Sequence, residues 1–228
     1  ARARYSRLLW RCGRQEEALD QMKIALRTAP QDPELHLQIA EQYLELGRIT
    51  EAQSHIQKVL DLAPQHPGGW VLQGRLALAR NNPEAGLTAF HRAAGLRPND
   101  RTILEWIARA YQARGDADQA LAVRQRIMDT FSPGEESVEA LIALAEAYRA
   151  VERYASAAET YLQAARKADN PEPYLVAAAE NYARAGQSQK ALGITDQLLA
   201  ENPQSHRARE LRDQLQGITV ASQSGILR

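Results

Sequence analysis

The sequence has little of what disulfide bonding, nucleic-acid binding or membrane insertion requires. It contains one cysteine, Cys12, so no internal disulfide can form and no redox compartment is indicated. Lys and Arg number 28 and Asp and Glu number 28, which leaves no bulk field to attract nucleic acid or an anionic membrane. No apolar run approaches the roughly 18 to 20 residues of a membrane span. We therefore expect no nucleic-acid partner and no membrane span in this chain.

Residues able to carry chemistry are also sparse. No two histidines have the i, i+4 spacing of a helical metal site, and Cys12 has no nearby partner for zinc or nucleophilic catalysis. No Gly-rich phosphate loop or nucleophile elbow is present. We predict a non-catalytic protein without metal or cofactor, with surface or boundary positions for the histidines: His36, His55, His66, His91 and His206.

Small residues, in contrast, recur at a fixed spacing. One set is separated by 34 residues except for a single step of 37: Ala18, Ala52, Gly86, Ala120, Ala157 and Ala191. A second set keeps the same phase: Ser6, Ala40, Gly74, Ala108, Ala145 and Ala179. A period between 20 and 50 residues indicates a solenoid or array whose repeats contact only their neighbours.

Each repeat is predicted to be a pair of antiparallel helices. In the second repeat, apolar residues at helical spacing run from Leu35 to Leu46, Gly47 breaks the chain, and a second apolar face follows from Ile49. In the third repeat, Asn82 is suited to cap the second helix and Pro83 to occupy its first position. Paired small residues such as Gly74 and Gly86 would let the two helices approach closely.

These features resemble the tetratricopeptide repeat family. The resemblance is carried by Trp70 and Gly74 in a first helix, and by two second-helix series: Gly86, Phe90, Ala93 and Pro98, then Ala157, Tyr161 and Ala164. It implies an all-α fold, a right-handed α-solenoid of about six helix-turn-helix repeats with a C-terminal capping helix. The predicted array is a single domain over 1–216, with repeats near 1–32, 33–66, 67–100, 101–137, 138–171 and 172–205, and a capping helix over 204–216.

Two departures from the pattern carry predictions of their own. Arg124 and Thr195 replace the second-helix aromatic, so we expect locally different or partly solvated packing there. Three extra residues lie within 132–135, where Ser, Pro and Glu resemble a capping box and predict a helix lengthened by about one turn. The segment 217–228 loses helical periodicity and is predicted to be a flexible tail, or a short motif around Ile226 and Leu227 that docks elsewhere.

The resemblance also implies a binding surface, the concave groove lined by first helices. Its predicted binding residues are Arg7, Trp10, Glu41, Val71, Arg75, Glu105, Trp106, Arg109, Ile142, Glu146 and Glu180. Mixed charges and apolar patches suit an extended or helical peptide that carries both. Trp106 beside Arg75 and Arg109 is the expected centre. The positions at which some family members hold a chaperone's terminal carboxylate with Lys and Asn carry other residues here, which argues against that role.

The sequence therefore predicts a protein-interaction scaffold that binds a partner peptide or helix. Two alternatives stay open: a recruitment array of a larger enzyme such as a transferase, and a self-assembly module that gives a homo-oligomer. A helical-repeat RNA binder is disfavoured, because such proteins use a basic groove and acidic residues line this one. The chain does not begin with Met and its first repeat starts partway through a helix, so we expect a fragment of a longer protein. No localisation follows.

Overall fold

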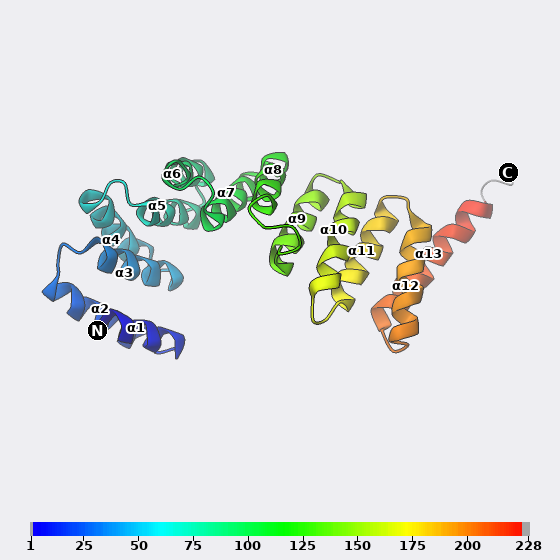
Figure 1. Ribbon diagram of the computed structural model, residues 1–228, viewed down its shortest axis with the longest axis horizontal. Helices are drawn as coiled ribbons and strands as arrows, with labels where there is room; N and C mark the ends of the chain where they lie inside the picture. Colours follow the sequence, from blue (N-terminus) through cyan, green and yellow to red (C-terminus); the bar gives the residue numbers. More distant parts are fainter. Residues whose placement is uncertain (1, 225–228) are drawn as a thin grey trace. The chain divides into compact units, whose positions relative to one another are not determined.

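The computed structural model describes the backbone of residues 2–224 and the side chains of residues 2–216, and over these residues the chain forms helices without strands (Figure 1). The helices are α1 (Arg2–Arg11), α2 (Gln15–Thr28), α3 (Pro33–Glu45), α4 (Ile49–Leu62), α5 (Pro67–Ala79), α6 (Pro83–Leu96), α7 (Arg101–Arg114), α8 (Ala117–Met128), α9 (Val138–Ala150), α10 (Tyr154–Lys167), α11 (Glu172–Arg184), α12 (Ser188–Glu201) and α13 (His206–Ser224). The fold is all-α, as predicted.

Contacts between residues divide the chain into two compact units, Ala1–Asp116 and Ala117–Arg228. Unit 1 contains α1 to α7 and unit 2 contains α8 to α13. The division falls inside the fourth predicted repeat, where the sequence predicts no boundary. Within each unit, a helix packs against its neighbours in the chain, as a repeat architecture requires.

The turn inside each repeat has one recurring geometry. A residue with a left-handed backbone ends each first helix: Gly13, Gly47, Asn81, Gly115, Glu152 and Gly186. The amide of the following residue then donates to the carbonyl oxygen five positions earlier, as from Arg48 to Tyr43 at 2.8 Å and from Arg153 to Tyr148 at 2.9 Å. These bonds satisfy helix-end carbonyls in the manner of a Schellman motif. The same turn therefore recurs in each repeat and determines how its two helices pair.

The predicted cap of the third repeat is confirmed. The Asn82 side chain accepts a hydrogen bond from the Ala85 amide at 3.1 Å, and Pro83 is the first residue of α6. Between repeats, Asp32 and Asp100 cap α3 and α7 in the same way, each accepting from two amides. These bonds fix where each helix begins.

The predicted close approach of paired small residues is also confirmed. A Cβ atom added to Gly86 would lie 3.4 Å from the Gly74 carbonyl oxygen. One added to Gly74 would lie 2.4 Å from the Phe90 ring, which is fully buried. The ring of Phe90 therefore occupies the space that a side chain at position 74 would need.

The expectation of partly solvated packing at Arg124 and Thr195 is wrong. Both side chains are buried, with 6% and 0% exposure. The Thr195 hydroxyl donates to the Leu192 carbonyl oxygen at 2.9 Å, so burial leaves its donor satisfied. Thr195 can thus occupy the core because the backbone of its own helix supplies an acceptor.

The predicted helix lengthening at 132–135 is also wrong. Helix α8 ends at Met128 and α9 begins at Val138, so the extra residues form a loop. Lys167 holds this loop from α10, because its Nζ donates to the carbonyl oxygens of Gly134 at 2.6 Å and Glu136 at 3.0 Å. Its ion pair with Glu136, at 2.9 Å, lowers the pKa of that carboxyl to about 2. Tertiary contacts outweigh the local capping pattern.

The capping helix is longer than the sequence predicts. Helix α13 runs to Ser224, so it continues through much of the segment 217–228 that was expected to be a flexible tail. Once a helix is started on a packed core, each further residue adds a backbone hydrogen bond, and no proline interrupts this segment. The predicted motif at Ile226 and Leu227 lies outside the described residues.

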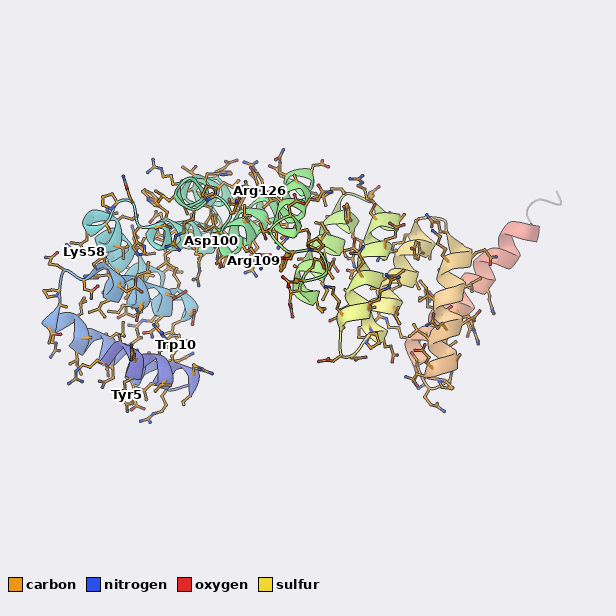
Figure 2. The ribbon with its side chains drawn as sticks, viewed as in Figure 1. Tyr5, Trp10, Lys58, Asp100, Arg109 and Arg126 are labelled. Carbon is orange, nitrogen blue, oxygen red and sulfur yellow. The ribbon has the colours of Figure 1, made fainter. Side chains whose placement is uncertain are left out.

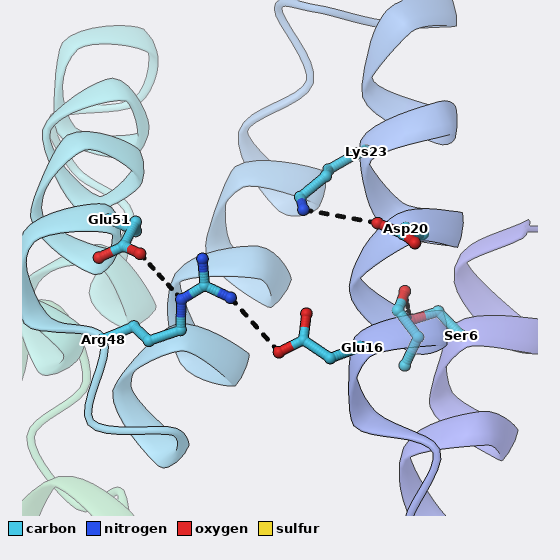
Figure 3. Close-up of polar contacts among 7 residues, drawn as sticks. Ser6, Glu16, Asp20, Lys23, Arg48 and Glu51 are labelled. Carbon is cyan, nitrogen blue, oxygen red and sulfur yellow. Dashed lines mark hydrogen bonds and ion pairs between the residues drawn. The ribbon is translucent and has the colours of Figure 1, made fainter.

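Ion pairs also connect neighbouring repeats of unit 1. Figure 3 shows Arg48, at the start of α4, between Glu51 at 2.8 Å and Glu16 of α2 at 3.5 Å. Its guanidinium also lies 4.8 Å from the centre of the Tyr43 ring. Such exposed pairs contribute only about 0 to 1 kcal/mol each, so they orient side chains more than they hold the repeats together. No helix among the described residues has the length and apolarity to span a membrane.

Candidate peptide-binding face

The first helices of unit 1 gather on one face. Helix α5 contacts both α3 and α7, whereas the neighbouring second helices α4 and α6 make fewer contacts with each other. The first helices therefore line the inner side of this unit, and Figure 2 places Trp10 and Arg109 on that side. We refer to the surface of α1, α3, α5 and α7 as the first-helix face.

One column of this face consists of charged residues one repeat apart. Arg7, Glu41, Arg75 and Arg109 follow at intervals of 34 residues, which puts them at equivalent positions of successive first helices. Arg75 and Glu41 form an ion pair at 3.1 Å. Residues that are one repeat apart in the sequence therefore lie in a row on neighbouring first helices.

Trp106 of α7 is the centre of a cluster on this face. The Arg75 guanidinium carbon lies 5.0 Å from the Trp106 ring centre, and that of Arg109 lies 4.9 Å away. Phe90 stacks against the same indole, with 6.0 Å between ring centres and 15° between planes. An indole attracts cations through its electron-rich face. The predicted grouping of Trp106, Arg75 and Arg109 is therefore present, and Phe90 packs against the same indole.

The two arginines of the cluster differ in their partners. Arg75 is mostly buried, with 18% of its side chain exposed, and Glu41 neutralises it. Arg109 is exposed and has no carboxylate partner among the described residues. The cluster consequently presents one uncompensated positive charge held against an aromatic ring.

A hollow of about 230 Å³ lies beside the cluster. Its apolar lining comes from three first helices, with Leu37 from α3, Val71 and Leu72 from α5, and Ile103 from α7. Glu41, Arg75 and Trp106 line it as well. The volume is below the roughly 300 to 1,000 Å³ of small-molecule pockets, so a single side chain of a peptide fits it better than a cofactor.

The other predicted residues of unit 1 do not join this cluster. Trp10 of α1 donates its indole N–H to Glu45 of α3 at 2.8 Å. Arg7 is exposed on α1, and Glu105 is half-buried on α7 without lining the hollow. Sequence reasoning missed Arg97 and Asp100, which approach the hollow from the loop before α7. Loop residues have no helical phase that could have indicated this position.

The predicted residues of unit 2 lie in a different environment. On α9, Glu146 accepts a hydrogen bond from the Tyr161 hydroxyl and lies 3.5 Å from Arg149. Burial, and then this bond, raise the pKa of Tyr161. Ile142 of α9 packs partly buried against the core of unit 2. Glu180 of α11 pairs with Arg207 of α13 at 3.1 Å.

The expectation of surface or boundary histidines fails at His36, which is 6% exposed. Its Nδ1 lies 2.9 Å from the Nδ1 of His55, and its Nε2 lies 3.1 Å from the Pro30 carbonyl oxygen. Since that oxygen can only accept, Nε2 of His36 carries its proton and Nδ1 accepts from His55. In the part of the chain that the structure describes, no group of three or more His, Cys, Asp or Glu side chains is placed to hold a metal ion.

The fold and this face define a helical-repeat protein. Models of the tetratricopeptide repeat match residues 9–76, 71–134, 140–173 and 174–205. The chain belongs to the tetratricopeptide repeat family. Such proteins are generally scaffolds for protein interactions, so the partners implied for this chain are proteins. Comparison with curated proteins gives no match.

Solved structures share the fold. A thermophilic tetratricopeptide repeat protein of Thermus thermophilus is 24% identical, with a TM-score of 0.64 over 79% of this chain and 96% of that one. PilF of Pseudomonas aeruginosa is 15% identical, with a TM-score of 0.71 over 94% and 96%. YrrB, described as having an unusual peptide-binding site, is 14% identical, with a TM-score of 0.65 over 84% and 97%. At these identities the likeness concerns the fold alone.

Proposed function

We propose that the first-helix face of unit 1 binds a peptide segment of a partner protein, without catalysis. The observation that carries the proposal is the Trp106 cluster, where two guanidinium groups lie against one indole beside an apolar hollow. The best-fitting segment presents a carboxylate to Arg109 and places an aliphatic side chain in the hollow. Buried aromatic and arginine anchors commonly dominate peptide affinity.

The geometry favours this ligand on charge as well as shape. Arg75 is already neutralised by Glu41, whereas Arg109 has no acidic partner among the described residues. A carboxylate that binds there replaces water at an exposed cation and leaves no buried charge unpaired. The proposal is also supported by YrrB, which shares the fold and is described as having a peptide-binding site.

Peptide display selection on the purified chain tests the proposal. We expect a consensus with Asp or Glu near Leu, Ile or Val. Binding of the consensus peptide should weaken about tenfold or more in Trp106→Ala and Arg109→Glu, since a lost anchor costs about 1.4 kcal/mol or more. Arg109→Glu is preferred to Arg75→Glu because reversal at position 75 would also place two carboxylates together at Glu41.

A matched control is available in the same unit. Arg92 lies 4.6 Å from the Trp70 ring centre, so it forms a similar cation–aromatic pair, but neither residue lines the hollow. Arg92→Glu should leave peptide affinity within about twofold. Failure to enrich any peptide, or equal losses in Arg92→Glu and Arg109→Glu, would contradict the proposal. Mass in solution at several concentrations would then test self-assembly, the alternative that needs no second protein.

A further inference from the structure

A second groove lies in unit 2, between α11 and α13. It consists of two hollows of about 380 and 500 Å³. Glu180 of α11 and Arg207 of α13 line both hollows, and their side chains form an ion pair at 3.1 Å. This ion pair therefore lies where the two hollows meet.

The first hollow combines an apolar floor with a carboxylate. Pro173, Val176 and Ala177 of α11 form the floor, and Val176 is only 3% exposed. Glu172 also lines the hollow, but its two oxygens accept from Ser205 at 2.6 Å and from Asn202 at 3.2 Å. Glu172 thus holds the start of α13, which leaves Glu180 as the carboxylate of the first hollow that can face a ligand. Arg184 and Glu210 line the second hollow.

Arg207 contributes little to the fold in this position. Its side chain is 73% exposed, and the contact with Glu180 is its one ion pair among the described residues. It lies in the first turn of α13, a turn without acidic residues, where a cation opposes the helix dipole. An exposed ion pair of this kind is weak, so a competing cation can displace Arg207 at small cost.

We infer that Arg207 occupies the place of a partner's cationic side chain, and that the α11–α13 groove binds a peptide segment with Arg or Lys next to an apolar residue. The incoming side chain would pair with Glu180 and lay its aliphatic stem on Val176 and Ala177. Displacement of Arg207 joins the two hollows and makes room for the flanking residues. Unit 2 is suited to such a partner, because it carries 12 Lys and Arg against 15 Asp and Glu.

The inference does not depend on the proposed function of unit 1, because the two sites share no residue. A panel of fluorescent synthetic peptides, each with one Arg flanked by Leu or Val, supplies the probe. Each peptide has a partner in which neutral citrulline replaces Arg. Binding to the whole chain is measured by fluorescence anisotropy at low and moderate salt.

Two variants should change affinity in opposite directions. Arg207→Ala removes the internal competitor, so Arg peptides should bind about threefold tighter or more. Glu180→Gln removes the acceptor charge while keeping the size of the side chain, and affinity should fall about tenfold. Citrulline peptides should bind weakly to all three proteins and should not distinguish Arg207→Ala from the unmodified chain.

Arg209→Ala serves as the matched control, since it removes a cation from the same helix without lining either hollow. It should leave affinity unchanged. Weaker or unchanged binding in Arg207→Ala would overturn the inference, as would binding that survives Glu180→Gln or failure of every Arg peptide to bind. Concentration-dependent dimers that Glu180→Gln abolishes would assign the groove to a second copy and equally overturn it.

Discussion

One buried position of the repeat has different chemistry in the two units. Its occupants are Met22, Ile56 and Phe90 in unit 1, and Arg124, Tyr161 and Thr195 in unit 2. Unit 1 fills this position with apolar side chains, whereas unit 2 fills it with side chains that carry polar atoms. The same helix pairing therefore tolerates both. The hydroxyls of Tyr161 and Thr195 have hydrogen-bond acceptors there, Glu146 and the Leu192 carbonyl oxygen.

The two units also differ in their numbers of charged residues. Unit 1 carries 16 Lys and Arg and 13 Asp and Glu, and unit 2 carries 12 and 15. At the equivalent groove position, unit 1 has three arginines and one glutamate, Arg7, Glu41, Arg75 and Arg109, whereas unit 2 has two glutamates, Glu146 and Glu180. The balanced charge of the whole chain therefore hides a basic excess in unit 1 and an acidic excess in unit 2. Composition over the whole chain argues against nucleic acid, but only the division into units shows which ligand charge each face would favour.

The largest expected effect is at Phe90. Phe90→Ala should destabilise unit 1 by about 3 to 5 kcal/mol, because it removes a fully buried ring and leaves a cavity. Urea unfolding followed by tryptophan emission measures this change, since all three tryptophans, Trp10, Trp70 and Trp106, lie in unit 1. Emission of Trp106 should also shift, because the indole loses its stacking partner.

The equivalent change in unit 2 sharpens the comparison. Thr195→Val keeps the volume and removes one hydrogen bond to the Leu192 carbonyl, so it should cost only about 1 kcal/mol. Far-UV circular dichroism would record it, and tryptophan emission should not change. Equal losses in Phe90→Ala and Thr195→Val would contradict the claim that unit 1 depends on apolar volume at this position.

The next effect concerns two helical glycines. Gly74→Ala should destabilise by about 1 to 3 kcal/mol, since the added Cβ would lie 2.4 Å from the Phe90 ring. In unit 2, Gly193 lies within α12 and has no atom within 4 Å of an added Cβ. Gly193→Ala should therefore stabilise by about 0.5 to 1 kcal/mol through helix propensity. Urea midpoints of the two variants should move in opposite directions.

The repeats explain which features of the fold and of the candidate site could be predicted from the sequence. The 34-residue period of Ala18, Ala52 and Gly86 determined helix pairing, turns and the phase of the first-helix face, since each depends on contacts between neighbouring repeats. The Trp106 cluster followed from the same phase. The contacts that were not predicted do not recur from repeat to repeat. They are the contacts of Lys167 with the extra loop and the ion pair of Arg207 with Glu180.

Burial of polar residues was equally hard to predict from the sequence. His36 and Arg124 look like surface residues because imidazole and guanidinium groups are polar. The structure buries both, and for His36 it supplies His55 and the Pro30 carbonyl as partners. A sequence pattern gives the phase of a helix but not the partners that another helix brings.

The contacting histidines, His36 and His55, make unit 1 sensitive to mild acid. Burial, followed by the neighbouring His36 and Lys23, lowers the pKa of His55 to about 4. Between about pH 6.5 and 4, the unfolded chain therefore binds a proton at His55 that the folded chain does not. Stability should fall by about 1 to 2 kcal/mol over this range, allowing for partial solvent screening. Above about pH 6.5, His55 should contribute no pH dependence to the stability.

His55→Gln tests this dependence. Unfolding followed by tryptophan emission at several pH values should show a smaller loss of stability on acidification in the variant. Glu136 in unit 2, with its pKa near 2, loses its contribution only as pH falls from about 4.5 towards 2. Unit 1 should therefore lose stability first as pH is lowered. If stability falls with pH equally in the unmodified chain and in His55→Gln, His55 is not the cause.

The smallest expected effect is at the turns. Inside the repeats, three of the four left-handed turn residues of unit 1 are glycines, whereas the two of unit 2 are Glu152, at φ 58°, and Gly186. A side chain with a Cβ is strained in that conformation by about 1 kcal/mol. Glu152→Gly should therefore stabilise unit 2 by up to about 1 kcal/mol, less the larger entropy of glycine in the unfolded chain. Gly47→Glu in unit 1 should lose a similar amount. If both substitutions destabilise equally, the turn is not under backbone strain and the two units differ there only in sequence.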